Sequence, residues 1–344
     1  MNYRSIADLN KAIKSWISEL PGDLDLVVGI PRSGLLAAAL LSLYLNLPLT
    51  DVDGLCEGRI LATGRRFGRE RISGLWQRKL KVLVVDDSIN SGTQMREVKA
   101  RIETAGLSHE IYYAAVYASP KGHRYVDYWY EIVDTPRVFE WNIMHHHILI
   151  NCCVDIDGVL CRDPMPEEND DGERYLKFLT SVKPLVVPTK PIGWLVTCRL
   201  EKYRKITEEW LQRHGIQYNE LVMMDLPDKA TRVALGAHAK FKAQVYKSVN
   251  AALFIESSYS QAQVIARLAG KPVLCIETGQ MINPNFVVGA YTQGRKFAAE
   301  AISNPFGASL KLLRFVRRKL SVLWWRISAR AKKKDRRFWR REDG

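Results

Sequence analysis

The sequence predicts an α/β protein of two domains, each with a parallel sheet between two layers of helices. Seven short apolar runs bounded by turn residues alternate with helical stretches, which is typical of parallel strands joined by crossover helices. The length of 344 residues suits two domains. In such sheets ligands bind at the carboxyl ends of the strands. The runs are Leu26–Ile30, Val82–Val85, Tyr112–Tyr117, Ile148–Val154, Trp194–Thr197, Ala252–Ile255 and Val273–Ile276.

Composition is that of an ordinary globular protein, with 47% hydrophobic and 26% charged residues. We expect a cytoplasmic protein, because no apolar run reaches the ~18 residues that span a bilayer and the N-terminal segment lacks the layout of a secretory signal. The six cysteines form no CxxC pair and are expected to be reduced thiols. His145, His146 and His147 are not expected to bind a metal, because consecutive side chains point in different directions.

Two of the apolar runs are followed by loops suited to an anion. After Leu26–Ile30 comes Pro-Arg-Ser-Gly, which opens an apolar helix. The backbone N–H groups of such a loop and the helix N-terminus attract an anion, and Arg32 adds a charged fork. After Lys81, the four-residue apolar strand Val82–Val85 is followed by two adjacent acids, Asp86 and Asp87, and then by a small-residue loop that opens another helix.

These two segments together resemble the pyrophosphate loop and the phosphoribosyl pyrophosphate (PRPP) signature of type I phosphoribosyltransferases. The resemblance implies that Asp86 and Asp87 are catalytic: they hold the ribose hydroxyls and favour the positive charge that grows on the ring as pyrophosphate leaves. It also implies that Mg2+ bridges ribose and pyrophosphate and that the loop N–H groups cradle the 5-phosphate. Asn90 and Ser91 stand where the family more often has two threonines. The predicted PRPP-binding residues are Arg32, Ser33, Gly34, Asp86, Asp87, Asn90, Ser91, Gly92, Thr93, Arg65 and Arg66.

The last two of these residues lie in a segment rich in Gly and Arg, 57–71, placed where the family has a mobile loop that closes over pyrophosphate. An exposed basic loop is the alternative. Family members bind their acceptor through an added hood, and here the aromatic, partly basic segment Lys121–Asn142 is the candidate. Within it, Phe139-Glu-Trp141 resembles a stretch in members that act on purines, but the pattern defines no purine pocket and leaves the acceptor open.

A later strand, Cys152-Cys-Val, ends in Asp-Ile-Asp-Gly and resembles the first motif of the haloacid-dehalogenase (HAD) phosphatases. The resemblance implies that Asp155 is the nucleophile that forms an aspartyl-phosphate and that Asp157 is the general acid and base. Carboxylates two residues apart on extended backbone face the same side, as shared Mg2+ coordination requires.

The remaining HAD motifs follow in order. Thr197, after an apolar run, would hydrogen-bond the phosphoryl group, and Lys242 would neutralise its charge, with Lys240 and Lys247 as alternatives. Glu256 would be the acid on the metal side, followed by serines where members often carry a second acid. The predicted metal ligands are Asp155, Asp157 and Glu256. The spacing of the motifs leaves no room for a sizeable cap domain.

The resemblances predict two Rossmann-like three-layer domains, 1–145 and 148–300, and a basic amphipathic tail, 305–344. From Lys311 onward lie 14 of the 51 Lys and Arg but 3 of the 37 Asp and Glu, so the rest of the chain is nearly neutral. Trp324 and Trp325 suit a lipid headgroup layer, and basic residues flank an apolar stripe, so we expect binding to the inner face of the cytoplasmic membrane. The two alternatives for this tail are docking onto the protein itself and binding to nucleic acid. Membrane binding is the prediction, so no nucleic-acid partner is expected. The stripe is Leu313, Val316, Leu320, Leu323 and Ile327.

A transferase that uses PRPP makes a product bearing ribose 5-phosphate, and a phosphatase on the same chain would remove that phosphate. This combination resembles the bifunctional polysaccharide ribofuranosyltransferases. They add ribofuranose 5-phosphate to a lipid-linked glycan and then dephosphorylate it, in the biosynthesis of bacterial surface polysaccharides such as O antigen or capsule. Two alternatives stay open: a nucleobase phosphoribosyltransferase coupled to a nucleotide phosphatase, and a sensor of PRPP or nucleotides with a residual catalytic fold.

Overall fold

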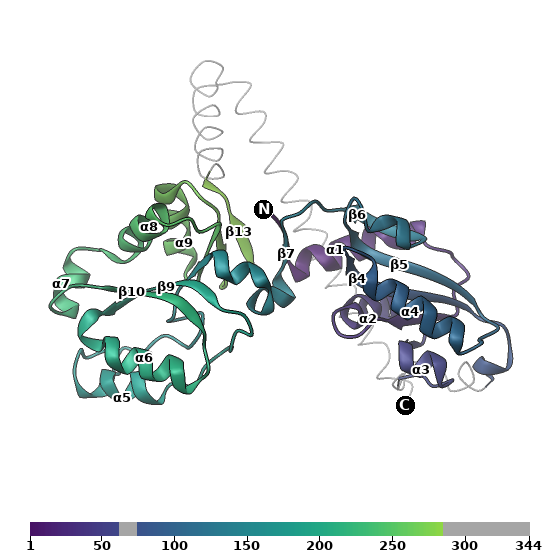
Figure 1. Ribbon diagram of the computed structural model, residues 1–344, viewed down its shortest axis with the longest axis horizontal. Coiled ribbons are helices and arrows are strands. Elements are labelled where there is room, and N and C mark those ends of the chain that lie inside the picture. Colours follow the sequence, from purple (N-terminus) through teal and green to yellow (C-terminus); the bar gives the residue numbers. More distant parts are fainter. Residues whose placement is uncertain (62–73, 285–344) are drawn as a thin grey trace, which may run out of the picture.

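The computed structural model describes residues 1–61 and 74–284, which form two separate α/β units with parallel sheets (Figure 1). Arg65, Arg66 and the tail 305–344 lie outside the described residues, so the predictions made for them stay predictions. No helix of the described part is long and apolar enough to cross a membrane.

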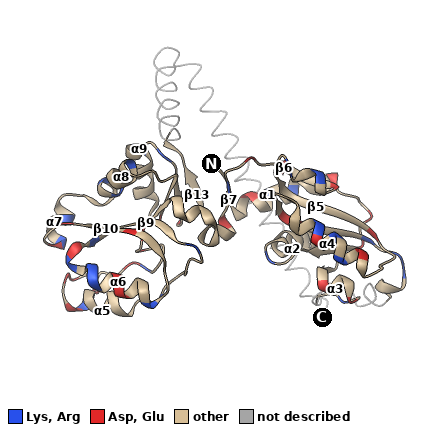
Figure 2. Cartoon of the chain, in the orientation of Figure 1, with Lys and Arg blue, Asp and Glu red and all other residues tan. Residues whose placement is uncertain are grey.

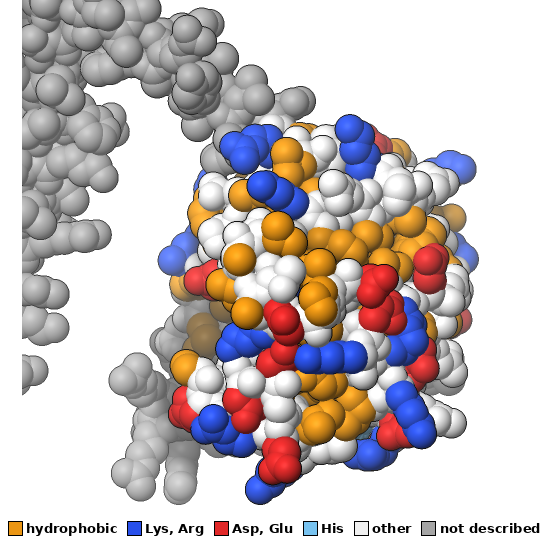
Figure 3. Space-filling model, turned by 90° about the vertical axis from the view of Figure 1, so that its left-hand side faces the viewer, with side chains coloured by type: hydrophobic (Ala, Val, Ile, Leu, Met, Phe, Trp, Pro, Cys, Tyr) orange, Lys and Arg blue, Asp and Glu red, His pale blue; other side chains and the backbone are white. Residues whose placement is uncertain are grey.

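Acidic and basic residues alternate over both units (Figure 2). At the left end of Figure 1, α7 (Lys229–Ala234) and the residue after it expose Val233 and Leu235, and Figure 3 shows apolar side chains among charged ones on this face.

The first sheet has five parallel strands in the order β3-β2-β4-β5-β6. Alternate residues of β4 enter two different cores, because side chains of a strand point to opposite faces. Leu83 and Val85 pack with α1 and α2, whereas Val82 and Val84 pack with α3 and α4, so helices cover both faces. The bounds are β2 Leu26–Gly29, β3 Leu49–Asp51, β4 Lys81–Ile89, β5 Glu110–Ala118, β6 Tyr128–Ile132, α1 Ile6–Trp16, α2 Gly34–Leu45, α3 Val52–Cys56 and α4 Thr93–Thr104.

The second sheet has six strands in the order β10-β9-β8-β11-β12-β13, all parallel except for the last pair. Helices α5 and α6 bury Phe178 and Trp210 on one face, and α8 and α9 bury Tyr246 and Ile265 on the other. Both sheets therefore have the three layers that the sequence predicted. The bounds are β8 Cys152–Val154, β9 Ile192–Leu200, β10 Tyr218–Met224, β11 Leu253–Glu256, β12 Val273–Cys275, β13 Gln280–Ile282, α5 Glu173–Ser181, α6 Arg204–Arg213, α8 His238–Ser248 and α9 Tyr259–Ala269.

All seven apolar runs contain a strand, but the one expected over Ile148–Val154 is wrong in its first half. Residues His147–Asn151 form a 3-10 helix, η6, and β8 begins only at Cys152. The His146 ring caps this turn, since its Nδ1 accepts a hydrogen bond of 3.2 Å from the Ile148 N–H. Gly193 of β9 lets the turn lie close, because a Cβ there would stand 2.4 Å from the Ile150 carbonyl oxygen.

A two-stranded parallel ribbon lies between the two sheets. It pairs β1 (Asn2–Arg4) with β7 (Arg137–Phe139). Phe139 packs into a core of the first sheet, whereas Val138 packs into a core of the second. The Tyr3 hydroxyl also donates a 2.9 Å hydrogen bond to the Gly279 carbonyl oxygen. The ribbon therefore ties the N-terminus and the connecting segment to both units.

We predict that Gly193→Ala destabilises the second unit by about 1–3 kcal/mol, the usual cost of forcing atoms into a packed site. The added methyl group would meet backbone atoms of the η6 turn, which cannot rotate away. Gly22→Ala is the matched control, because nothing lies within 4 Å of a Cβ there. Thermal unfolding followed by circular dichroism compares the two. Equal melting temperatures for both variants would contradict this packing.

Candidate active sites

The acid pair of the first unit is buried inside β4. The strand was expected to end before the acids, but it continues to Ile89, because Ser88 and Ile89 still pair with β5. The Asp87 N–H donates a 2.9 Å hydrogen bond to Asp86 Oδ1. Burial, and next the neighbouring Asp87 carboxylate, raise the pKa of Asp86 well above its ordinary value. A ligand that brings positive charge to this pair would therefore bind favourably.

The two predicted anion loops meet at this acid pair. Gly34 lies so close that a Cβ would stand 2.9 Å from Asp86 Oδ1, which explains the need for glycine. Gln94 Nε2, in the first turn of α4, donates a 3.1 Å hydrogen bond to the Pro31 carbonyl oxygen and so links the start of α4 to the loop before α2. Gly92 has a φ of +75°, a conformation that favours glycine. Arg32, Ser33, Asn90, Ser91 and Thr93 lie on these two loops.

Trp141 is a contact of the acid pair that sequence reasoning missed. Its indole Nε1–H donates a 2.8 Å hydrogen bond to Asp87 Oδ2. The ring stacks on Phe139 with centroids 5.0 Å apart, and Phe139 stacks on Tyr117 at 5.5 Å. Arg137 lies over the Phe139 ring, and burial lowers its pKa while the charges of Asp87 and Asp86 oppose that change. The aromatic segment that was expected to form a hood therefore contacts the acid pair and holds the Asp87 carboxylate in place.

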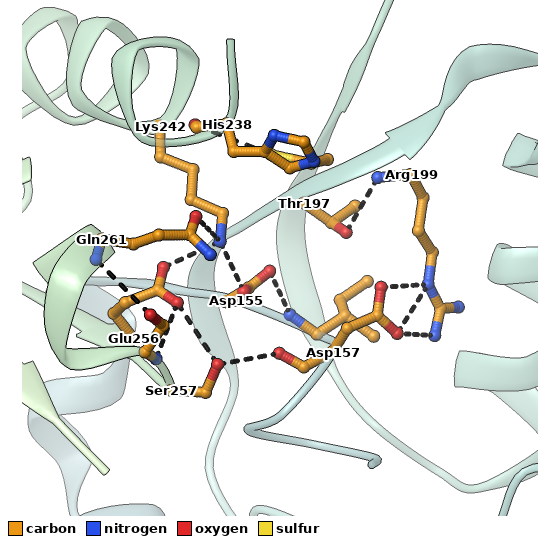
Figure 4. Close-up of polar contacts among 12 residues, drawn as sticks. Asp155, Asp157, Thr197, Arg199, His238, Lys242, Glu256, Ser257 and Gln261 are labelled. Atoms are coloured by element: carbon orange, nitrogen blue, oxygen red, sulfur yellow. Dashed lines mark hydrogen bonds and ion pairs between the residues drawn. The ribbon is translucent and has the colours of Figure 1, made fainter. Parts of the chain in front are cut away.

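The second site is built around a buried ammonium group (Figure 4). Lys242 Nζ donates hydrogen bonds of 2.6 Å to Asp155 Oδ2, 2.8 Å to Glu256 Oε2 and 3.3 Å to Gln261 Oε1. Asp155 follows β8, Glu256 ends β11 and Lys242 lies on α8. Lys240 and Lys247, the alternatives in the sequence, are exposed. The structure thus joins Lys242 alone of the three to Asp155.

Asp157 faces a different partner from Asp155. Its carboxylate accepts three hydrogen bonds of 2.6, 3.1 and 3.2 Å from Arg199, whose side chain is fully buried (Figure 4). The expectation of extended backbone from Asp155 to Asp157 is wrong, because β8 ends at Val154 and the chain bends at Ile156. The two carboxylates are therefore not presented side by side.

Arg199 is the second residue that sequence reasoning missed. Strand β9 runs past Thr197 to Leu200, so Thr197 and Arg199, two residues apart, lie on the same face of the strand. Thr197 is fully buried, and its Oγ1 accepts a 3.2 Å hydrogen bond from the Arg199 N–H. The signal available in the sequence was an arginine two positions after the threonine of this motif.

A cavity of about 230 Å³ opens beside these groups. Besides the residues already described, Asp163, Arg232 and His238 line it. Arg232 Nη1 donates a 2.6 Å hydrogen bond to the Cys198 carbonyl oxygen. Burial, followed by the charges of Arg232 and Lys242, lowers the pKa of His238. The cavity thus presents cationic and neutral donors opposite Asp155, as an incoming phosphate would require.

The oxygen atoms near Asp155 suit Mg2+, which prefers carboxylate and carbonyl ligands. Within 1–61 and 74–284, no three His, Cys, Asp or Glu side chains converge as a metal site. However, the Ser257 hydroxyl lies 3.4 Å from the Asp157 main-chain oxygen and 3.3 Å from Glu256 Oε1, so these two oxygens face one point. The donor set that fits the ion is Asp155, the Asp157 carbonyl oxygen and Glu256. The Asp157 carboxylate, expected as a ligand, is held by Arg199 instead.

If the first acid pair binds PRPP, as the resemblance implies, Trp141→Phe is predicted to lower kcat/KM for PRPP by about 10-fold, since one hydrogen bond to a charged group is lost while the aromatic stack is kept. Trp129→Phe is the control, because Trp129 is exposed and stacks on His123 away from the acids. Steady-state kinetics with PRPP as the varied substrate measures both. If the two variants behave alike, Trp141 does not position Asp87.

The second prediction concerns the pKa of Asp155, which burial raises to about 8 although Lys242 opposes the rise. Because a raised pKa makes the protonated fraction of Asp155 fall as the pH rises from neutral, Mg2+ binding should release more protons at pH 7 than at pH 9. Calorimetry in two buffers of different ionisation enthalpy counts the protons. Asp155→Asn should release none. Buffer-independent heats for the wild type at pH 7 would refute the raised pKa.

The N-terminal part of the chain is similar in structure to solved phosphoribosyltransferases. No protein-family model and no curated protein matches the sequence. The purine phosphoribosyltransferase of Pyrococcus horikoshii is 22% identical, covering 41% of this chain and 92% of its own, with a TM-score of 0.30. The xanthine-guanine-hypoxanthine phosphoribosyltransferase of Helicobacter pylori is 15% identical over 41% of this chain and 93% of its own, with a TM-score of 0.31. Leishmania donovani UMP synthase is 17% identical over 37% of this chain and 26% of its own, with a TM-score of 0.26. The described residues form a mixed α/β protein with parallel sheets.

Proposed function

We propose that this chain transfers ribofuranose 5-phosphate from PRPP to a hydroxyl group of a glycan and then hydrolyses the 5-phosphate. One observation carries the proposal: a single chain holds two buried acid sites, one between two anion loops and one around a buried lysine. The first arrangement suits a phosphorylated sugar with a cationic transition state, and the second suits phosphate-ester hydrolysis.

The transfer step uses the first site. The bond between ribose C1 and the pyrophosphate oxygen breaks, a bond from the acceptor oxygen to C1 forms, and the acceptor hydroxyl gives its proton to the departing pyrophosphate. Asp86 and Asp87 hold the ribose hydroxyls and stabilise the developing positive charge. The loop 90–93 binds the 5-phosphate, and the loop 32–34 binds pyrophosphate. Mg2+ supplies positive charge to the pyrophosphate when it is bound.

The hydrolysis step uses the second site. The Asp155 carboxylate attacks phosphorus, the bond to the ribose O5 breaks, and Asp157 gives that oxygen a proton; water then hydrolyses the aspartyl-phosphate with Asp157 as base. Arg199 holds the Asp157 carboxylate and so fixes its orientation. Lys242 and Thr197 bind the phosphoryl oxygens.

The acceptor and the location complete the proposal. The basic segment 305–344, with its apolar stripe, supports attachment to the cytoplasmic face of the membrane, where a lipid-linked glycan would be found. The segment between β8 and β9, which holds the helix α5, is too short for a sizeable cap domain. This supports a phosphatase site that is open to a bulky substrate. These features favour a step in surface polysaccharide biosynthesis.

The intermediate must change sites between the two steps. Asn151 and Ala252, which line a cavity next to the first site, directly precede β8 and β11, whereas Asp155 and Glu256 lie at the opposite ends of those strands. The second sheet therefore separates the first site from the second. The phosphorylated product has to leave the transferase site before it is hydrolysed.

We predict that Asp155→Asn accumulates a phosphoribosylated acceptor, since the amide cannot attack phosphorus. Asp87→Asn should form neither product. Mass spectrometry of reactions with PRPP, Mg2+ and an acceptor panel distinguishes them, and adding wild-type protein should convert the accumulated product to the ribosylated form. An acceptor panel in which only purines or pyrimidines react would replace the glycan with a nucleobase.

Because the intermediate leaves the first site, we predict that Asp155→Asn and Asp87→Asn proteins complement each other in solution. Their mixture should form the ribosylated acceptor after a lag that shortens with the concentration of the Asp87→Asn protein. A mixture that keeps accumulating the phosphorylated intermediate would mean that the two steps require one and the same molecule.

A further inference from the structure

The cavity of the second unit is lined by a cation with no role in the hydrolysis described above, Arg232 of α7. The other two buried cations of this site, Lys242 and Arg199, form ion pairs with acids of the protein. Arg232 is only 8% exposed, yet among the described residues it forms no ion pair. A buried charge is costly without a partner, so this guanidinium group is suited to an anion that comes from outside the protein.

One edge of the Arg232 guanidinium group lacks an acceptor among the described residues. Its only hydrogen bond there runs from Nη1 to the Cys198 carbonyl oxygen, at 2.6 Å. Nε and Nη2 donate from the same edge of the planar group, the fork that binds two oxygens of a phosphate at once. The Nε atom is buried and has no hydrogen-bond partner in the part of the chain that the structure describes. Buried donors are nearly always partnered, so this atom indicates a group that a ligand satisfies.

The structure fixes Arg232 beside the strand end that carries Thr197. Asp228 caps α7, because its side chain accepts a 2.7 Å hydrogen bond from the Thr231 N–H. At its other end, the Arg232 side chain is tied to the carbonyl group of Cys198, which directly follows Thr197 on β9. The guanidinium group therefore lies next to the threonine that the sequence predicts as a phosphoryl-binding residue.

Arg232 and Lys242 act on the same surroundings. Burial raises the pKa of the Cys198 thiol to about 12, and the charges of Lys242 and Arg232 oppose that rise. Burial lowers the pKa of His238, which also lines the cavity, and the same two charges lower it further. Two cations thus reach this cavity from α7 and α8, which suits a phosphate group that carries close to two negative charges.

Holding the Cys198 carbonyl group does not by itself account for an arginine at this position. A single N–H makes that hydrogen bond, so neither a buried positive charge nor a planar fork is needed for it. Binding of a phosphate ester uses both, because the ester offers negative charge and pairs of oxygens.

We propose that Arg232 binds the phosphoryl group of the substrate at the second site through Nε and Nη2, as a second cation beside Lys242. The inference rests on the proposed hydrolysis and deepens it by adding a substrate-binding residue that selects phosphate monoesters. A monoester has three terminal oxygens and close to two negative charges for the two cations to share. A diester has only two such oxygens and one charge.

The test replaces Arg232 by lysine, which keeps the charge and a donor for the Cys198 carbonyl group but lacks the fork, and by methionine, which lacks all three. Inorganic phosphate is the probe, and the ring signals of His238 in NMR spectra report its binding, because this residue lines the cavity. His238→Asn identifies those signals. With Mg2+ present, phosphate binding should weaken about 10-fold in Arg232→Lys and about 100-fold in Arg232→Met. Lys240→Met is the matched control, because it removes one charge from an exposed residue of α8 that does not line the cavity.

Kinetics with p-nitrophenyl phosphate and ribose 5-phosphate give a second measure. Both KM values should rise by the same factor in Arg232→Lys, since the contact is with the group that the two substrates share, and the KM for PRPP at the first site should not change. Wild-type affinity for phosphate in both Arg232 variants, or a KM that rises for ribose 5-phosphate alone, overturns the inference. A wild-type protein that binds phosphate through Arg232 but hydrolyses neither ester instead contradicts the proposed hydrolysis.

Discussion

The burial of carboxylates at strand ends is the constraint on which both candidate sites depend. A buried charge is costly unless it is paired, and the two units meet that cost differently. In the second unit, Lys242 lies between Asp155 and Glu256, and Arg199 holds Asp157, so the acids are paired with cations of the protein itself. In the first unit, an indole N–H reaches Asp87, and the pKa of Asp86 is raised. The first site is thus prepared for a ligand that brings or develops positive charge.

The segment that connects the two units also contributes to both cores and to the first acid site. Residues 137–151 pair with the N-terminal strand, supply side chains to cores of both sheets, bring Trp141 to Asp87 and line most of the cavity next to the first site. A change in this segment would therefore affect the first acid site while leaving the second acid site, at the far ends of its strands, intact. This arrangement would let the two proposed activities occupy one chain without sharing a site.

Local sequence pattern was sufficient for the three-layer sheets and for the side chains of Asp155, Lys242 and Glu256 that the structure brings together, because apolar runs and strand-end motifs are encoded by neighbouring residues. Sequence pattern failed to predict the local structure or the contact where residues far apart in the chain determine it. The turn at Ile148 depends on Gly193 of another strand, and the Trp141 bond to Asp87 joins residues 54 positions apart. The ion pair of Asp157 with Arg199 joins two different motifs 42 positions apart, so the position of Arg199 within its own motif did not reveal its partner. Short, exposed or edge strands such as β3 and β10 also lack a strong apolar signal.

The proposed reaction first displaces pyrophosphate from PRPP and then removes the 5-phosphate from the product, both on one chain. Phosphorus-31 NMR of the wild-type protein with PRPP, Mg2+ and a glycoside acceptor follows both steps in one sample. The account predicts that pyrophosphate appears first, that inorganic phosphate follows after a lag, and that the two reach equal amounts. Inorganic phosphate formed in the absence of the acceptor, or without an equal amount of pyrophosphate, would contradict it.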